Sequence, residues 1–282
     1  MLVLYFSIFY LPNGVAHLDV RWQPINGGIE IETQKRSQVD WLEADTIEIR
    51  RIIDENADVL KPLADWTDKD AHARQLVVTD LFWQTWYHAM AVPMLMRHEL
   101  EPPLSVVQRT IFESTATLVY LVKHDDSVRE SVVFLAASYL KDLDLYSSDD
   151  RVVVDRRKVL AEMPKDLVDL ARRRIGKHPW TWSGMNVRDL VAAAGMKGYD
   201  TAYRMLSRWV HAGGYGQFVC VTGEPGTIGT VSFGRFLSEA DVESHANLTR
   251  RNLHSSFRAL WGVFDGGDFD IRVDDPFAWL DS

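Results

Sequence analysis

The stretch Leu104–Lys123, LSVVQRTIFESTATLVYLVK, decides the fold class of this chain. Pro102 and Pro103 precede it, and proline suits the first turn of a helix because its missing N–H is not needed there. Apolar residues cover most of the circumference that this helix would have, and such a helix lies inside a bundle and not on its surface. The stretch therefore predicts a central helix with other helices packed around it.

Helical patterns occur on both sides of this central stretch. Ser37 could cap a helix that continues to about Lys61 and ends before Pro62. Asp125 or Asp126 could cap the helix that follows the central one. That helix is expected to end at about residue 146. Further helices are expected at about 70–100, with a kink at Pro93, and at 150–162, 165–175, 186–195, 199–211 and 239–264.

Two segments near the N-terminus have the alternation typical of strands. His17–Trp22 and Ile29–Thr33 alternate apolar and polar residues on either side of Asn26-Gly27, which is a strong turn signal. They predict a small β-hairpin, and a second hairpin or an ordered loop is expected near 217–234. The predicted fold is therefore an all-α helical bundle with a β appendage at 1–36, a bundle at 37–264 and an acidic C-terminal tail at 265–282.

Composition excludes several classes of function. The chain has 282 residues, 46% of them hydrophobic and 25% charged, as in ordinary globular proteins. A net charge of −9 opposes broad binding to a phosphate backbone. The single cysteine, Cys220, excludes an internal disulfide and a cysteine-based zinc site. Apart from the adjacent His98 and Glu99, which alone do not make a site, His72, His88, His98 and His124 have no carboxylate or histidine at metal-ligand spacing. We therefore expect neither a metal nor another cofactor.

The apolar segment Met1–Leu11 is too short to cross a bilayer, which requires about 20 residues. It also lacks the basic region with which a signal peptide begins. The segment fits a buried strand, or residues 1–16 precede the native start of the protein. These observations predict a cytoplasmic protein without membrane contact.

Arg109 and Glu113 are the first candidate site residues. They are four residues apart on the central helix, so their side chains lie on one face, and Tyr120 falls on the same side. Most of their neighbours are apolar, which predicts that this face is largely buried. Buried charges must be paired, so the two residues form either a structural ion pair or a ligand-binding or catalytic dyad.

The predicted helix at 199–211 carries the second group of candidates. Ser207 and His211 are four residues apart and can meet across one turn, with Arg204 and Tyr203 on the same helix. In the simplest interpretation, a neutral His211 hydrogen-bonds Ser207 and caps the end of the helix. In another, His211 activates Ser207 as a nucleophile, although no sharp turn of the kind that exposes such a serine is present.

Arg204 and His211 form an Arg-x6-His pair, which resembles the active-site motif of the HEPN ribonucleases. Those enzymes are helical bundles that usually act as dimers. The resemblance implies that Arg204 binds the scissile phosphate and that His211 assists attack by the 2′-hydroxyl of RNA. Met205 departs from the pattern, because a polar residue usually follows the arginine in that family.

A broader resemblance covers roughly residues 70–260. The chain resembles a widespread bacterial family of helical proteins of unknown function in three motifs. They are Arg109-Thr-Ile-Phe-Glu113, Trp182-Ser-Gly, and Leu206-Ser207 followed by His211 four residues after the serine. This resemblance implies that Arg109, Glu113, Ser207 and His211 form one cluster, with Tyr203 beside it. Two functions remain open: a binding or regulatory protein for a small polar ligand, or a metal-independent ribonuclease acting on RNA as a homodimer, in stress or phage defence.

Overall fold

The computed structural model describes the backbone of twelve segments. They are residues 2–10, 16–24, 29–55, 69–98, 101–147, 150–178, 181–196, 202–204, 206–207, 219–222, 230–233 and 239–264. Side chains are described at 38–55, 72–98, 103–147, 150–178, 181–196, 202–204, 206–207 and 240–264.

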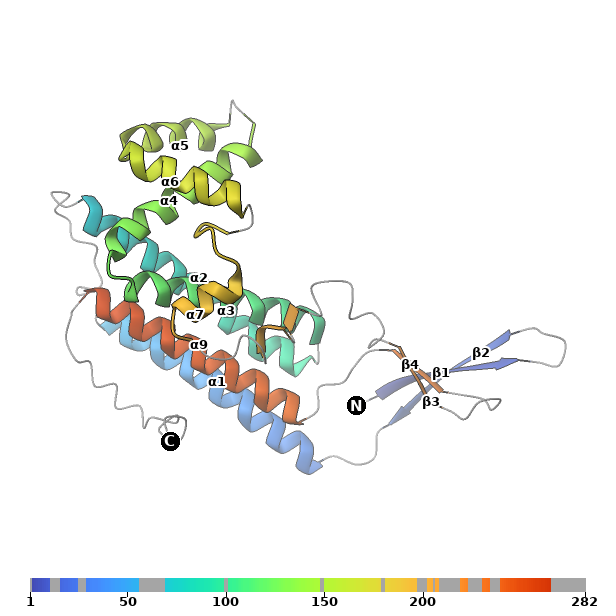
Figure 1. The fold of residues 1–282 in the computed structure, drawn as a ribbon. Helices are drawn as coiled ribbons and strands as arrows, with labels where there is room; N and C mark the ends of the chain where they lie inside the picture. Colours follow the sequence, from blue (N-terminus) through green and yellow to red (C-terminus); the bar gives the residue numbers. More distant parts are fainter. Residues whose placement is uncertain are drawn as a thin grey trace.

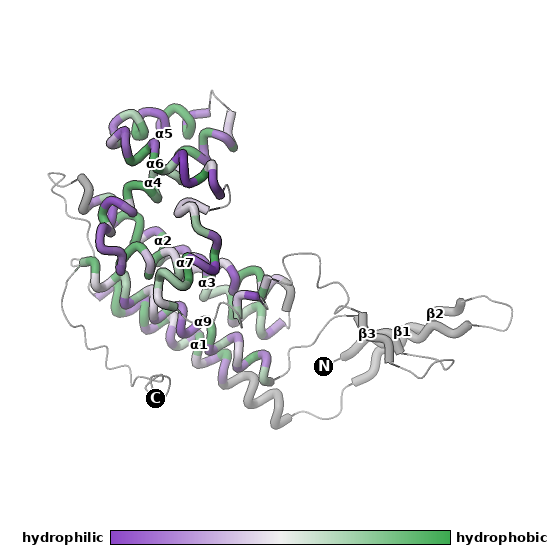
Figure 2. The backbone as a smooth tube through the Cα atoms, viewed as in Figure 1, coloured by the Kyte–Doolittle hydropathy of each residue, from purple (hydrophilic) through white to green (hydrophobic). Residues whose placement is uncertain are grey.

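The bundle is all-helical, as the sequence predicts (Figure 1). Hydrophobic and hydrophilic residues alternate along the helices (Figure 2), so that each helix can turn an apolar face toward its neighbours. The helices are α1 (Ile29–Glu55), α2 (Lys69–Arg97), α3 (Glu101–Lys123), α4 (Ser127–Leu145), α5 (Arg151–Glu162), α6 (Lys165–Lys177), α7 (Val187–Ala193) and α9 (Glu239–Phe264).

Helix α3 is the central element of the bundle. It contacts α2, α4, α7 and α9. Its largest apolar side chains are almost completely buried, which agrees with a helix that is apolar around most of its circumference. These side chains are Leu104, Ile111, Phe112, Leu118 and Leu121.

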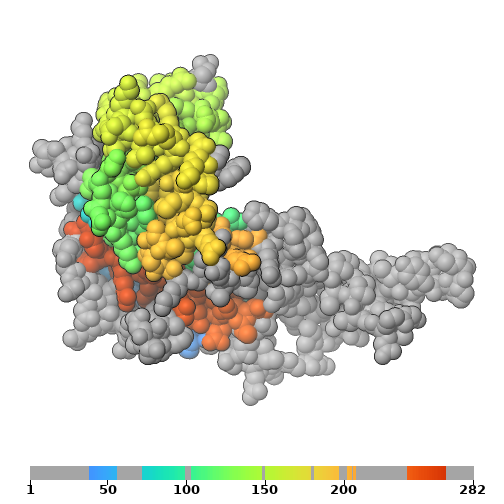
Figure 3. Space-filling model, in the orientation of Figure 1, coloured from blue at the N-terminus to red at the C-terminus, as the bar shows by residue number. Residues whose placement is uncertain are grey.

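The remaining helices form two groups around α3. Helices α1 and α9 pack side by side against α2, whereas α5 and α6 pack on α4 (Figure 1). Among the coloured segments, α4, α5, α6, residues 181–196 and α9 are visible on the face shown in Figure 3. Asp126 is the cap of α4, since its carboxylate accepts a hydrogen bond from the backbone N–H of Arg129. No helix in the described part of the chain is both long and apolar enough to span a bilayer.

The N-terminal hairpin predicted between His17–Trp22 and Ile29–Thr33 is wrong. Residues 29–33 form the first turns of α1, which begins eight residues before Ser37. Five alternating residues are too few to separate a strand from a helix, and here they run directly into a helical segment. The backbone of β2 (Ala16–Pro24) instead pairs antiparallel with β1 (Leu2–Tyr10), and β3 (Val219–Thr222) pairs with β4 (Thr230–Phe233) in the sheet order β2-β1-β4-β3.

Candidate functional site

The carboxylate of Glu113 joins α3 to the helical segment that contains Tyr203. Nε of Arg109 donates a hydrogen bond of 2.8 Å to Oε1 of Glu113. The hydroxyl of Tyr203 donates a bond of 2.7 Å to the same oxygen. The guanidinium of Arg109 also lies over the ring of Tyr203, 5.2 Å from its centre, at a distance that permits a cation–π interaction. One carboxylate oxygen thus holds three side chains together.

A small apolar cluster supports this arrangement. Phe112 and Ala116 of α3 pack with Val191 of α7 and with Tyr203, and all four are buried. The rings of Phe112 and Tyr203 are 5.7 Å apart. Ala202 and Tyr203 form a π-helical turn, a local variant of the helix that is common at functional sites. The cluster therefore fixes the tyrosine ring and aims its hydroxyl at Glu113.

The ion pair is less buried than the sequence predicts. The side chain of Glu113 is 39% exposed and that of Arg109 is 21% exposed. Phe112, one residue before Glu113, is buried on the apolar side of α3, whereas the side chain of Glu113 lies on a less covered side of the same helix. Solvent can therefore reach the side chain of Glu113.

The titration of the cluster follows from its contacts. Burial raises the pKa of Tyr203 to about 12, and the hydrogen bond to Glu113 acts in the same direction. Burial opposes the charged form of Arg109, but the hydrogen bond and the negative charge of Glu113 outweigh it and raise the pKa of Arg109. Tyr203 is therefore a neutral hydrogen-bond donor at physiological pH.

Tyr203→Phe tests this link, because it removes only the hydroxyl. We expect the free energy of unfolding at pH 7 to fall by about 2 kcal/mol, since the lost bond is to a charged acceptor. In the wild type, the raised pKa of Tyr203 adds stability below pH 10 that is lost as the pH rises toward 12. Urea unfolding across this range should show that loss in the wild type and a smaller one in the variant. Equal pH dependence in both proteins would contradict the assignment.

The other predicted site residues are only partly brought together. Ser207 lies four residues after Tyr203, and its buried Oγ is close enough to the Tyr203 hydroxyl to oppose the rise in the pKa of Tyr203, although it makes no hydrogen bond of full geometry in the described structure. Arg204 is exposed. His211 lies outside the described residues, so its contacts with Ser207 and Arg204 stay predictions. Tyr120 does not join the cluster, since it packs farther along α3 against His124 and Trp182.

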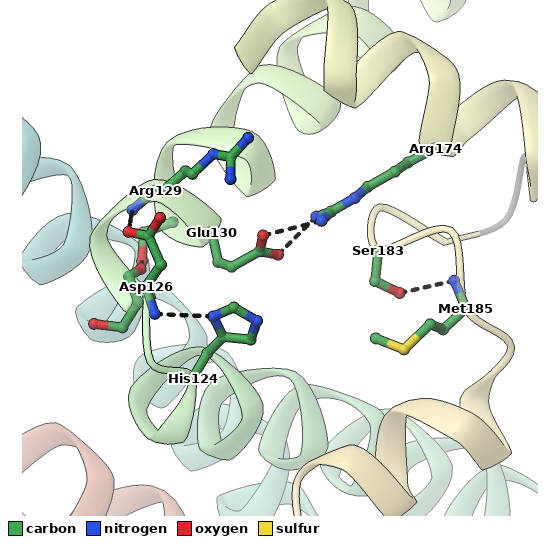
Figure 4. Close-up of polar contacts among 9 residues, drawn as sticks. His124, Asp126, Arg129, Glu130, Arg174, Ser183 and Met185 are labelled. Atoms are coloured by element: carbon green, nitrogen blue, oxygen red, sulfur yellow. Dashed lines mark hydrogen bonds and ion pairs between the residues drawn. The ribbon is translucent and has the colours of Figure 1, made fainter. Parts of the chain in front are cut away.

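A second polar cluster, absent from the sequence prediction, joins α4 to α6 (Figure 4). Arg174 donates two hydrogen bonds, of 2.6 and 2.9 Å, to the two carboxylate oxygens of Glu130, whose side chain is 4% exposed. Gly184 has a φ of +72°, and a Cβ there would lie 3.2 Å from Cγ of Arg174. Of the three consecutive arginines 172–174 in α6, Arg172 and Arg173 are exposed, whereas the side chain of Arg174 is only 21% exposed.

A third group of polar side chains is buried between α3 and α9. The amide of Gln108 donates to the backbone carbonyl of His245 at 2.7 Å and to the hydroxyl of Thr249 at 2.6 Å. Nδ1 of His245 lies 3.0 Å from the amide oxygen of Gln108. All three residues are nearly inaccessible to solvent. These buried hydrogen bonds fix the register of α3 against α9.

Among the described residues, no group of three or more His, Cys, Asp or Glu side chains could hold a metal ion.

A family model described as a family of unknown function (DUF5677) matches residues 75–218, just over half of the chain, and the chain belongs to this family. The prediction of a helical family of unknown function is confirmed. No curated protein and no solved structure matches the chain. The matched region contains Arg109, Glu113 and Tyr203, whereas α1 and α9 lie outside it.

Proposed function

We propose that this member of the family is an intracellular binding or regulatory protein that recognises a small polar ligand at Glu113. The observation that carries the proposal is a carboxylate that is anchored from one side and reachable from the other. Arg109 and Tyr203 hold Oε1 of Glu113, while 39% of the side chain stays accessible.

The free side of the carboxylate indicates what kind of ligand would bind. Among the described residues, no donor reaches Oε2 of Glu113, so this oxygen can accept a hydrogen bond from a ligand N–H or O–H. The positive charge of Arg109 balances the carboxylate, which disfavours a bare cation as ligand. A neutral molecule with hydrogen-bond donors, such as an amide, a polyol or a nucleoside, fits this electrostatic environment best.

The rigidity of the site favours binding over an incidental ion pair. Two hydrogen bonds and the packed ring of Tyr203 hold the carboxylate before a ligand arrives, so little conformational entropy is lost on binding. The buried hydroxyl of Ser207, four residues from Tyr203, is a further group that could bind a polar ligand after a side-chain rotation.

The test is the thermal stability of the full chain with millimolar neutral amides, polyols and nucleosides. A ligand that binds only the folded state raises the melting temperature, and we expect at least one class to do so. Glu113→Gln keeps the shape of the side chain but weakens the acceptor, and it should abolish the shift. Glu48→Gln, on the exposed face of α1, is the matched control and should retain it. The proposal is overturned if no class raises the melting temperature or if Glu113→Gln responds like the wild type.

A ribonuclease of HEPN type is the second candidate, and the exposure of Arg204 favours it because a phosphate-binding arginine must be reachable. The family that matches the chain has no assigned function and does not support this resemblance. RNA cleavage by the wild type, lost in Arg204→Ala and in His211→Ala at unchanged melting temperature, would replace the binding proposal with this enzyme.

A further inference from the structure

Helix α2 carries an apolar stripe on the face that points away from the core. The stripe consists of Leu76, Trp83, Tyr87, Met90 and Met94. Trp83 is half-buried, and the other four side chains are between 45% and 63% exposed. Large apolar side chains gathered on one exposed face are typical of an interaction surface.

The spacing of the stripe is that of a helix that pairs with another helix. Asp80 and Arg97 belong to the same face of α2. Together with the stripe they occupy positions that are alternately four and three residues apart, namely 76, 80, 83, 87, 90, 94 and 97. This is the heptad pattern of a coiled-coil seam. The core-facing side of the same helix, which includes Val78, Phe82 and Ala89, is already covered by α3, α4 and α9. The stripe is thus a second apolar face of α2.

We propose that this stripe pairs α2 with α2 of a second copy of the chain, in antiparallel orientation. In an antiparallel pair the two kinds of heptad position face each other. Trp83 then lies opposite Met94 of the second copy, and Tyr87 lies opposite its Met90. Asp80 lies opposite Arg97 of the second copy, so both ends of the seam join opposite charges. A parallel pair would instead place Asp80 against Asp80 and Arg97 against Arg97.

The surroundings of the stripe agree with such a seam. Arg97 binds both Glu43 and Asp40 of α1, and 45% of its side chain stays accessible beside them. The guanidinium of Arg50 lies 5.3 Å from the centre of the Trp83 ring and holds it in place. Ile47 on α1 is 69% exposed and follows Thr46, whose carbonyl accepts a hydrogen bond from Trp86 of α2.

The length of the stripe sets the expected strength of association. From position 76 to 97 the helix is about 30 Å long, which gives a contact at the low end of specific protein interfaces. We therefore expect a dimer that dissociates on dilution, and sedimentation equilibrium should show the mass rising from one chain to two with concentration. Met90→Lys should abolish the rise, because it places a charge in the centre of the seam. Leu145→Lys, at an exposed apolar position of α4, is the matched control and should not.

Cross-linking tests the orientation of the two helices. Cys220 is the only native cysteine, so Met90→Cys and Leu76→Cys are each made in the Cys220→Ser chain. In the antiparallel seam the two Met90→Cys residues lie within one turn of each other, whereas the two at position 76 are about 37 Å apart along the axis. A short bis-maleimide should link Met90→Cys at least about tenfold faster than Leu76→Cys. Equal cross-linking rates at the two positions would indicate a parallel seam. A chain that stays monomeric and does not cross-link would show that the stripe has another partner. Either result overturns the proposal.

Discussion

Replacing Glu130 with alanine is expected to lower the free energy of unfolding by about 3–5 kcal/mol, because it leaves a charge without its partner inside the protein. The carboxylate accepts two hydrogen bonds from Arg174 and is almost inaccessible to water. In Glu130→Ala the guanidinium of Arg174, which is itself only 21% exposed, must either stay unpaired or pull its helix toward solvent. Both outcomes weaken the packing of α6 on α4.

The measurement is urea unfolding followed by circular dichroism. Asp169→Ala is the matched control on α6, since it removes the partner of Arg172 from a solvent-exposed pair, and it should cost less than about 1 kcal/mol. Adding Arg174→Met to Glu130→Ala should recover part of the loss, because the double variant no longer buries a charge. A loss as small as that of the control would show that the buried pair contributes little to stability.

The Glu130–Arg174 pair also affects the candidate site through the loop that follows α6. Gly184 packs closely on the side chain of Arg174, and Trp182 packs against Phe134 of α4 with ring centres 5.3 Å apart. This loop leads into α7, whose Val191 contacts Tyr203. A change at Glu130 can therefore reach the tyrosine that anchors Glu113, even though it lies in another part of the bundle.

The parts of the fold and the site that could be predicted from the sequence are those set by local spacing. Arg109 and Glu113 are four residues apart, so helical periodicity alone places them together, and the structure shows the bond between them. Helix α9 is predicted at its observed bounds because its apolar periodicity is long and unbroken.

The parts that could not be predicted depend on contacts between distant segments. Glu130 and Arg174 are 44 residues apart, and Gln108 and His245 are 137 apart, so no local pattern marks either pair. Tyr203 was expected beside the cluster, but its bond to Glu113 spans 90 residues and depends on how two helices dock. The exposure of Glu113 likewise depends on which neighbours cover that side of α3, which periodicity does not specify.

The family match raises the question of which residues form the folding unit, and a fragment limited to 75–218 answers it. We expect this fragment to lose cooperative folding, because it lacks α1 and α9, which pack on α2 and α3. Without α9, the buried ring of Phe82 loses its contact with Phe257, and Gln108 loses all the partners that it has in the described structure. The apolar faces of α2 and α3 that α9 covers would then meet water, which opposes folding because a domain is stable by only about 5–15 kcal/mol.

The fragment 29–264, which contains every described helix, is the matched control and should unfold cooperatively in urea with a sharp near-ultraviolet dichroism signal. The fragment 75–218 should show neither, and should bind a dye that recognises exposed apolar surface. Cooperative unfolding of 75–218 would mean that α1 and α9 are accessory to a core that folds alone. The expected result would instead mean that the position of α3, which carries Glu113, depends on helices beyond the family match. Residues 75–218 would then supply the site, and α1 and α9 would supply the stability that keeps it in place.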